Sequence, residues 1–500
     1  MSDCHLSLCM IVRDEAAMLP GFLSAVAGLW DELVVADTGS RDGSADLVRA
    51  AGGQVVDFPW CDDFAAARNA SLAAATGRWV VCLDADERVD RELASALRRM
   101  VHADRTAGAA TIVMRNELPE GGRRESRLLR CFRNVPEIRF RHRIHEDVAD
   151  DVAAWLPRHG LEMRHLPGGV DHLGYVRATA AARDKKARDV RLLHAALADD
   201  PGDLYCRFKL LELARFWDDP DLFAAEAEPA RKALEAATRA QLDGRHWSGD
   251  LAALIAQSLA GPPLKALAWL DGQARRVECG PSWHLRRGIL LEEAGRGSEA
   301  EAAFRSCLAG VASPTNGYAP LPPSRPLLGL CRLAARRGDV AAATALALQA
   351  ATDAPHDAEA LLAAVSFQPP AAAMAFATAH ARRHPDSTTP LAQSLLTAGR
   401  PQDALALLES APPRSADGPG ILVLALALGI GRDVDIGTDL EAAGRQLRSW
   451  LQALRASGNA VLCEAFTERA GTLAGAFPWL ESWLEDRFTA GAASLSPSRR

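Results

Sequence analysis

Two carboxylates stand directly behind an apolar run near residue 80. Residues 79–83 (WVVCL) are all apolar, and Asp84 and Asp86 follow at a spacing of i, i+2. A buried parallel strand reads as a continuous apolar run, and open α/β sheets bind ligands at the carboxyl ends of such strands. Carboxylate oxygens suit a hard divalent cation that also binds water and a substrate diphosphate, which is the arrangement that a nucleotide-sugar enzyme needs. The alternative is that Asp86 caps a helix beginning near Arg91.

Asp37 and Arg68 are the next candidates for ligand contacts. Asp37 closes a second apolar segment, residues 32–36, and two glycines behind it permit a tight turn. Its carboxylate is placed to accept the imide N–H of a uracil ring, or it forms an Asx turn that caps a helix beginning at Ser44. Arg68 lies in a helical segment, where its guanidinium either offers two parallel contacts to a pyrophosphate or faces water.

These candidates lie in a part of the chain where short apolar strands alternate with amphipathic segments. Such alternation predicts right-handed βαβ units on a mostly parallel sheet. Residues 109–175 are less regular, with further β-rich pieces at 110–114 and 128–132. The strands predicted before this point are 6–12, 32–36, 54–58 and 79–83, and the predicted helices are 15–29, 44–51 and 62–76.

From about residue 178 onward nearly every segment reads as an Ala- and Leu-rich helix, with Gly or Pro between helices. A pattern typical of a tetratricopeptide (TPR) helix pair begins at Gly288 and recurs at Leu327 and, more weakly, at Leu391. One pair cannot bury its apolar face alone, so such repeats stack into a solenoid. A non-repetitive helical bundle is the alternative, because the spacing departs from the usual period of about 34 residues. We predict an α/β domain at residues 1–177 and a TPR-like all-α solenoid at residues 178–500.

Composition limits the class of protein. The chain has 500 residues, a formal net charge of −7 and a pI near 6.0, so nucleic acid is not expected as its main ligand. Its ten cysteines show no CxxC pair and no zinc-ligand spacing, which favours a reducing compartment. No basic segment precedes the first apolar run, and residues 421–430 are too few to span a bilayer. We expect a cytoplasmic protein without a transmembrane segment, and peripheral contact with the inner membrane stays open.

The ordered motifs of the first half resemble those of glycosyltransferase family 2, which has the GT-A fold. Residues 10–15 (MIVRDE) are similar to the family's first strand and turn, residues 35–43 (VADTGSRDG) to its nucleotide loop, and residues 67–69 (ARN) to the helix before its Asp-x-Asp motif. Residues 58–64 (FPWCDDF) and 143–146 (RIHE) further resemble a bacterial branch in which TPR repeats follow the transferase. The S-linked glycopeptide synthases are relatives of that branch.

The resemblance implies a nucleotide-sugar donor, with a UDP-sugar the first choice, and a divalent metal, Mn²⁺ or Mg²⁺. It implies donor contacts from Asp37, Arg68 and Asp84, and metal ligation by Asp84 and Asp86. His172, near the end of the domain, is a further candidate ligand for the metal or a phosphate, although a single histidine is more often structural.

Inverting transfer also needs a base that takes the proton of the acceptor hydroxyl or thiol. Glu146 is the candidate, with His145 beside it, because the family places its catalytic acid in a segment after the Asp-x-Asp motif. Neighbouring residues on a strand face opposite ways, so only one of the two is expected to enter the site. Asp147, which directly follows Glu146, is the nearest alternative base.

A series of arginines lies between the metal motif and the end of the domain. These side chains either neutralise a diphosphate or an anionic acceptor, or face water from strand surfaces. The series consists of Arg127, Arg130, Arg133, Arg139, Arg141 and Arg143.

The leading hypothesis is a metal-dependent inverting glycosyltransferase whose helical repeats recruit a protein, peptide or polysaccharide acceptor, or a protein partner. The rival from another class is a TPR adaptor that carries a catalytically weak transferase domain. A third hypothesis is nucleotidyl transfer to a sugar phosphate. Residues 11–16 lack the Gly-rich, basic loop that this last reaction normally requires.

Overall fold

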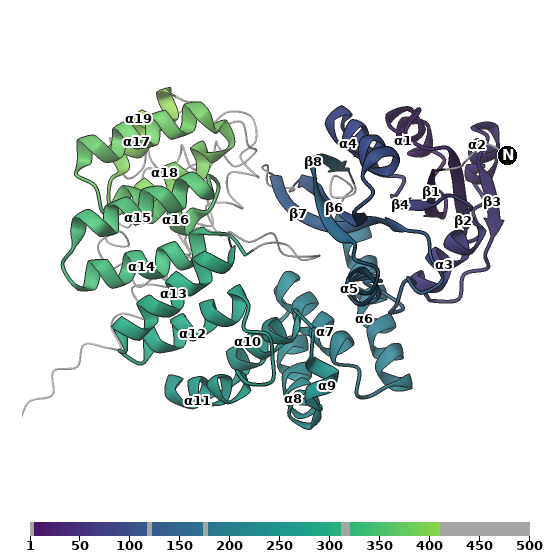
Figure 1. Ribbon diagram of the computed structural model, residues 1–500. Coiled ribbons are helices and arrows are strands. Elements are labelled where there is room, and N and C mark those ends of the chain that lie inside the picture. The colour runs from purple at the N-terminus through teal and green to yellow at the C-terminus, as the bar shows by residue number, and fades with distance from the viewer. Residues whose placement is uncertain (1–4, 118–122, 174–178, 312–320, 411–500) are drawn as a thin grey trace, which may run out of the picture. The chain divides into compact units, whose positions relative to one another are not determined.

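The computed structural model describes residues 5–117, 123–173, 179–311 and 321–410 (Figure 1). The chain divides into two compact units, Met1–Leu321 and Pro322–Arg500, which we describe separately. The apolar stretch at 421–430 and the rest of the predicted solenoid beyond 410 lie outside the described residues. Within the described ranges, no helix is long and apolar enough to cross a membrane.

One mixed sheet forms the α/β domain of the first unit. Its spatial order is β3-β2-β1-β4-β7-β6-β8-β5. Strands β3, β2, β1 and β4 run parallel, β7 runs antiparallel to both β4 and β6, and β8 pairs in parallel with β6 and antiparallel with β5. The parallel part confirms the predicted βαβ order. The strands are β1 (Leu6–Val12), β2 (Glu32–Asp37), β3 (Gln54–Asp57), β4 (Trp79–Cys82), β5 (Glu87–Val89), β6 (Ala107–Glu117), β7 (Arg123–Arg133) and β8 (Glu162–His172).

Helices cover both faces of this sheet, which explains why the neighbouring strands β1, β2 and β4 are largely apolar and buried. On one face, Leu8 and Met10 of β1 belong to a core with residues of α1, α2 and α4, and on the other, Cys9 belongs to a core with α3 and α5. A strand that is buried on both faces needs apolar side chains at successive positions. The helices are α1 (Leu19–Ala25), α2 (Ser44–Ala50), α3 (Phe64–Ala74), α4 (Arg91–Ala103) and α5 (Ala149–Arg158).

The predicted TPR-like register is present in the helices that follow. In the first unit, a Cβ atom on Gly288 would lie 2.6 Å from the Phe304 ring, so only glycine allows this close contact between α12 and α13. Gly295, between these two helices, has a φ of 75°, which L side chains rarely adopt. The helices of this region are α6 (Thr179–Asp199), α7 (Leu204–Phe216), α8 (Pro220–Ala236), α9 (Arg239–Leu242), α10 (Ser248–Ser258), α11 (Pro263–Gln273), α12 (Pro281–Glu293) and α13 (Gly297–Val311).

The second unit continues the same pattern within itself. Gly338 lies between α14 and α15 with a φ of 76°, and Gly399 lies between α18 and α19 with a φ of 73°. Ala343, Ala350 and Ala404 fill the buried small positions. Its elements are α14 (Ser324–Arg336), α15 (Val340–Asp353), α16 (Ala358–Ser366), α17 (Pro370–Arg383), η2 (Pro385–Ser387), α18 (Thr388–Thr397) and α19 (Pro401–Ser410).

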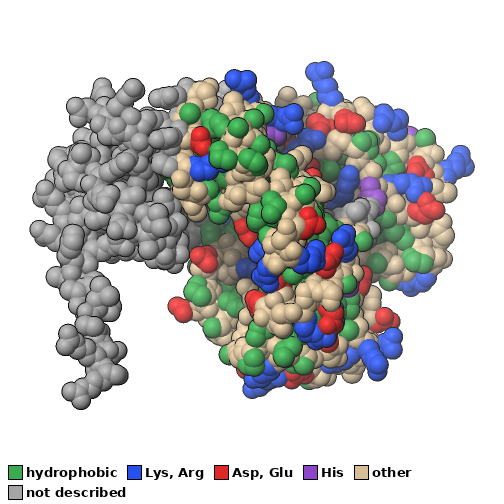
Figure 2. All heavy atoms as spheres, turned by 90° about the vertical axis from the view of Figure 1, so that its left-hand side faces the viewer, with side chains coloured by type: hydrophobic (Ala, Val, Ile, Leu, Met, Phe, Trp, Pro, Cys, Tyr) green, Lys and Arg blue, Asp and Glu red, His purple; other side chains and the backbone are tan. Residues whose placement is uncertain are grey.

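Figure 2 shows acidic, basic and hydrophobic side chains interspersed over the described part of one face of the molecule. Among the residues that the structure describes, three large hydrophobic side chains are about half exposed: Phe216, Leu264 and Val340. They come from different helices, α7, α11 and α15, and single exposed apolar residues are normal on protein surfaces.

Helices α6 and α7 share a hydrophobic core with the α/β domain. Ile144, from the loop before α5, packs in one cluster with Leu192 of α6 and Leu210 of α7, and Phe64 at the start of α3 packs against it. The strand-rich part ends with β8 at His172, but the compact unit continues to Leu321. We propose that the first helices belong physically to the α/β domain and that an independent part begins only beyond them.

This shared core predicts the behaviour of shortened chains. A chain that ends at Asp200 loses α7 and exposes Ile144 and Leu192, so it should aggregate or bind a hydrophobic dye. A chain of residues 1–321 keeps the whole cluster and should unfold cooperatively in urea. Gel filtration, dye fluorescence and urea titration of the two chains test this, and a stable, monomeric, dye-free chain ending at Asp200 would contradict the shared core.

Candidate active site

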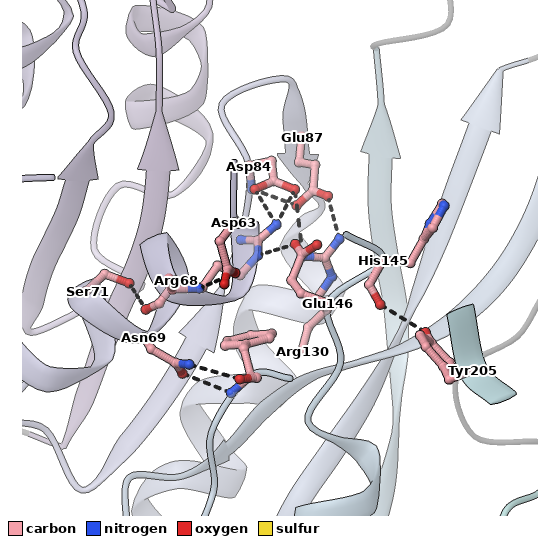
Figure 3. A network of polar contacts seen from close by, with 12 residues as sticks. Asp63, Arg68, Asn69, Ser71, Asp84, Glu87, Arg130, His145, Glu146 and Tyr205 are labelled. Carbon is pink, nitrogen blue, oxygen red and sulfur yellow. Dashed lines mark hydrogen bonds and ion pairs between the residues drawn. The ribbon is translucent and has the colours of Figure 1, made fainter. Parts of the chain in front are cut away.

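Arg68 is the centre of a buried network of charges at the end of β4 (Figure 3). Its Nε atom donates to Oε1 of Glu146 at 2.6 Å, and its Nη2 atom donates to both carboxylate oxygens of Asp84 at 3.0 and 3.2 Å. The arginine side chain is 7% exposed, so the alternative of a water-facing arginine is wrong. Burial lowers the pKa of the Arg68 guanidinium, but Asp84 and Glu146 more than compensate and keep it well above its ordinary value.

Helix α3 brings Arg68 into this position. Asp63 caps the helix, its side chain accepting a hydrogen bond from the backbone of Ala66 at 2.8 Å. Ala65, Arg68 and Leu72 are all buried, at the spacing of one helical face. The arginine therefore occupies a core position of an amphipathic helix, where its charge must be paired.

Asp84, in the turn after β4, lies between two arginines. Besides Arg68, the Nη1 atom of Arg130 lies 3.7 Å from Oδ2 of Asp84. Val81 of β4 pairs with Cys131 of β7, and this register places Arg130 beside the end of β4. Burial raises the pKa of the Asp84 carboxyl, but the two guanidinium groups outweigh burial and hold it below its ordinary value.

Glu87 is a further buried carboxyl in the same network. Its Oε2 atom accepts a hydrogen bond from the backbone N–H of Asp84 at 3.0 Å, and its Oε1 atom lies 3.4 Å from Nη2 of Arg130. Its side chain is 1% exposed. Burial raises the pKa of Glu87 to about 7, against the opposing effect of Arg130. Because Glu87 accepts from the backbone N–H of Asp84, this buried carboxyl holds the turn after β4 in place.

Asp86 and His172 form a second pair. The Nε2 atom of His172 lies 3.1 Å from Oδ2 of Asp86, and its Nδ1 atom lies 2.8 Å from Oδ1 of Asn116. Strand β8 places His172 opposite Glu87 of β5 and Asn116 of β6. Because an amide oxygen and a carboxylate both only accept, the two contacts are hydrogen bonds together only when both ring nitrogens carry a hydrogen, that is, in the charged imidazolium form. Burial lowers the pKa of His172, but the hydrogen bond and charge of Asp86 raise it above its ordinary value.

The alternative role of Asp86 as a helix cap is wrong. The cap of α4 is Asp90, whose Oδ1 atom accepts a hydrogen bond from the backbone of Leu93 at 2.8 Å. Asp86 is thus not needed to begin the helix, and its carboxylate is 28% exposed beside His172.

The donor types fit a divalent metal at Asp86 and His172. A carboxylate oxygen and an imidazole nitrogen are ordinary ligands of Mn²⁺, and Asn116 orients the imidazole as the supporting partner of a metal-bound histidine does. Asp84 is held by Arg68 instead. Across the described residues, the carboxylates of Asp84 and Asp86 and the imidazole of His172 do not meet as one three-ligand group. All three predicted ligands thus lie at one end of the sheet, but only Asp86 and His172 contact each other.

Asp37 lies at the carboxyl end of β2, which, like β4, neighbours β1. Its Oδ1 atom accepts hydrogen bonds from the backbones of Gly39 and Ser40, at 3.0 and 2.8 Å, so the Asx turn is present. Its Oδ2 atom accepts no hydrogen bond from the part of the chain that the structure describes. One oxygen therefore shapes the loop and the other remains for a ligand.

The loop after β1 is tied to the loop after β2. The backbone N–H of Asp14 donates to Oγ of Ser40 at 3.0 Å, and that of Ala16 donates to Oδ2 of Asp42 at 2.8 Å. Asp14 has a φ of 54°, which no right-handed helix contains. A turn at residues 16–18 follows, and the helix predicted from residue 15 starts only at Leu19.

Comparisons with known proteins agree with this architecture. A family model described as Glycosyl transferase family 2 matches residues 7–158. A TPR repeat-containing protein of Synechococcus elongatus is 38% identical over 283 residues, which cover 53% of this chain and 70% of that protein. The SPbeta prophage-derived glycosyltransferase SunS of Bacillus subtilis is 23% identical over 201 residues, which cover 38% of this chain and 45% of SunS.

The chain belongs to glycosyltransferase family 2.

Two solved structures align with parts of this glycosyltransferase. A mannosyltransferase of Pyrobaculum calidifontis, in complex with GDP-mannose and Mn²⁺, is 19% identical with a TM-score of 0.29, over 59% of this chain and 87% of the other. PilW, a type IV pilus biogenesis factor, is 16% identical with a TM-score of 0.30, over 49% of this chain and 95% of the other.

His145 does not join the charge network of the glycosyltransferase. Its backbone carbonyl accepts a hydrogen bond from the hydroxyl of Tyr205 at 2.9 Å, and its φ of 54° turns the loop away from a strand conformation (Figure 3). Burial, helped by Lys209, lowers the pKa of His145 to about 4. Of the two predicted neighbours, the structure thus brings only Glu146 to Arg68 and Asp84.

Of the arginine series, Arg130 alone contacts the acidic network. The others hold the backbone or form ion pairs elsewhere, so the series is not one ligand-binding patch. Arg127 donates to the carbonyl of Leu166, Arg133 to that of Ala107, and Arg139 to that of Val135, while Arg141 pairs with Asp151 and Arg143 with Asp199.

Sequence reasoning missed Glu87 and Asn116. Glu87 follows Asp86 directly and is the first residue of β5. Its position beside the Asp-x-Asp motif was the signal from which the sequence could have indicated a site residue. Asn116 gave no signal of its own, because only the pairing of β6 with β8 places it beside His172.

Removal of the central guanidinium should be costly. Arg68→Ala leaves Asp84 and Glu146 without their shared partner, and breaking a buried ion pair in this way costs about 3–5 kcal/mol. The control is Arg49→Ala, which removes an exposed pair with Asp46 (3.1 Å) and should cost less than about 1 kcal/mol. Urea unfolding measures both, and equal losses in the free energy of unfolding would show that the network contributes no stability.

Proposed function

We propose that this family 2 enzyme is a metal-dependent, inverting hexosyltransferase. It moves a sugar from a nucleotide-sugar donor, with a UDP-sugar first, to a protein, peptide or polysaccharide acceptor. The main support for the proposal is that Arg68 forms hydrogen bonds to both Glu146 and Asp84. Glu146 is the candidate base, and Asp84 follows β4, at the end of the strand where the donor is expected to bind.

Glu146 is the proposed general base. Arg68 fixes one of its oxygens, Oε1, while Oε2 accepts no hydrogen bond from the described residues, and the side chain is 14% exposed. A carboxylate held in this way can take the proton of an acceptor hydroxyl or thiol as that atom attacks the anomeric carbon. The bond from that carbon to the donor diphosphate then breaks, and the configuration inverts.

The donor side of the site is supported by residues at the ends of β2, β4 and β8, together with Arg68 of α3 and Arg130 of β7. Asp37 offers Oδ2 to the imide N–H of uracil, while Arg68 and Arg130 supply positive charge near the diphosphate. Asp86 and His172 are the proposed ligands of Mn²⁺ or Mg²⁺, with Asp84 nearby. Such an ion, when bound, neutralises the leaving diphosphate.

The acceptor side is supported by the position of the Glu146 loop. Ile144 of this loop packs into the core shared with α6 and α7, and Tyr205 of α7 donates to the carbonyl of His145. A polymer bound along the first helices would therefore lie close to the base. We propose that the repeats recruit the acceptor or a partner that delivers it.

The metal assignment predicts the effect of Asp86→Asn. Loss of a charged oxygen ligand should abolish Mn²⁺-dependent binding of UDP and Mn²⁺-stimulated donor hydrolysis. Calorimetry with UDP in the presence and absence of Mn²⁺ measures the first effect without an acceptor. Asp46→Asn, at an exposed carboxylate, is the matched control and should bind as the wild type does. Undiminished Mn²⁺-dependent binding by Asp86→Asn would remove this residue from the site.

The base assignment predicts that Glu146→Gln keeps donor affinity but loses rate. The amide preserves shape and cannot accept a proton, and loss of a general base costs about 10²- to 10⁴-fold. Single-turnover donor hydrolysis, with water as acceptor, isolates the chemical step. The exposed Glu137→Gln variant is the control. A near wild-type rate in Glu146→Gln, with a dead His145→Ala or Asp147→Asn variant, would reassign the base.

A screen of UDP-, GDP- and TDP-sugars, with and without Mn²⁺, identifies the donor. If no donor binds or turns over under any of these conditions, the result would favour the rival proposal of a TPR adaptor with a weak transferase domain.

A further inference from the structure

A second cluster of metal-ligand types lies away from Asp84 and Asp86. His142, Asp203 and Cys206 place one donor atom each within 4.8 Å of one another, and they are the single such group of three or more in the described part of the chain. His142 lies in the loop before α5, whereas Asp203 and Cys206 lie at the start of α7. The fold thus brings together donors that are about sixty residues apart in sequence, which is why no zinc-ligand spacing is visible there.

The distances suit a small tetrahedral ion. The Oδ2 atom of Asp203 lies 3.8 Å from Nδ1 of His142 and 3.2 Å from Sγ of Cys206. Ligands at the zinc bond lengths of about 2.0–2.3 Å lie about 3.3–3.7 Å from one another in a tetrahedron, so the two separations from Oδ2 of Asp203 need only small adjustments.

The role of Asp203 at the helix start leaves its second oxygen available. Oδ1 accepts the capping hydrogen bond from the backbone of Cys206 at 3.0 Å, and Oδ2 is the atom that faces both His142 and the thiol. The ring of His142 stacks on Tyr205 with centroids 4.0 Å apart, which fixes its orientation. The cap and the donor set therefore use different atoms of the same carboxylate.

Charge and burial favour a soft divalent ion over a hard one. Cys206 is buried and belongs to the apolar cluster around Leu210, while His142 and Asp203 are 21% and 22% exposed. A thiolate, a carboxylate, a neutral imidazole and Zn²⁺ sum to zero charge, which suits such a partly apolar place. The oxygen-rich pair at Asp86 lacks sulfur and suits Mn²⁺ or Mg²⁺ instead.

We propose that His142, Asp203 and Cys206 form a Zn²⁺ site that fastens the loop of residues 141–147 to α7. Binding forms a bond from the metal to Sγ, and the thiol proton passes to the buffer. Water takes the fourth position, at the exposed side of the cluster. The proposal does not rest on the proposed transfer chemistry, because no hydrogen bond or ion pair among the described residues joins the three ligands to Arg68, Asp84 or Glu146.

Cobalt substitution of the full chain tests the proposal. After dialysis against a chelator, one Co²⁺ per chain should give the near-ultraviolet band of a cobalt–thiolate bond, and Zn²⁺ should abolish that band. Cys206→Ser should remove it. Cys61→Ser, at an exposed cysteine, and Asp86→Asn, at the oxygen-rich site, should keep it.

Two further variants separate ligation from folding. Asp203→Asn keeps a good helix cap, and His142→Phe keeps a ring to stack on Tyr205, yet each removes a ligand. Loss of a ligand should weaken Zn²⁺ binding by at least about 10- to 100-fold, the effect known for supporting partners of metal ligands. Zn²⁺ should raise the melting temperature of the wild type and leave that of Asp203→Asn unchanged.

The proposal is overturned if the wild type gives no cobalt–thiolate band, or if the band persists in Cys206→Ser. It is also overturned if Zn²⁺ raises the melting temperature of Asp203→Asn as much as that of the wild type. The cluster would then be a helix cap with a buried thiol.

Discussion

A buried guanidinium organises the catalytic end of this protein. Arg68 occupies a core position of α3, where an unpaired charge would be strongly unfavourable. Its partners come from two other places, Asp84 after β4 and Glu146 in the loop before α5. The sheet, the helix and the loop must therefore be assembled together before the charge is compensated. The same requirement that stabilises the fold holds Asp84 and Glu146, on the proposed donor and acceptor sides, at a fixed separation.

The antiparallel half of the sheet completes a site that the parallel half begins. Asp37 is the last residue of β2 and Asp84 follows β4, at the carboxyl ends of parallel strands, as expected of an open α/β sheet. Strand β7 adds Arg130, and β8, held between β5 and β6, adds His172. A parallel sheet alone would present acidic loops without these counter-charges and without an imidazole.

Local patterns predicted the parallel half well, and long-range pairing explains what they missed. Apolar runs marked β1 and β4 almost to the residue, and the glycines at 295, 338 and 399 marked the turns between repeated helices. The burial of Arg68 was readable in part, from its place between Ala65 and Leu72 on one helical face. The contact of His172 with Asn116 could not be predicted, because it depends on the pairing of two strands whose contacting residues are 56 positions apart in the sequence.

The core that Ile144 shares with α6 and α7 has a consequence for how such proteins diversify. Recombination that replaced every helix after the α/β domain would cut through this core and leave the Glu146 loop without its support. Recombination beyond Leu321 would leave the first unit intact. Distal helix pairs can therefore be exchanged or added without disturbing this core, while the proximal helices α6 and α7 must be kept together with the α/β domain.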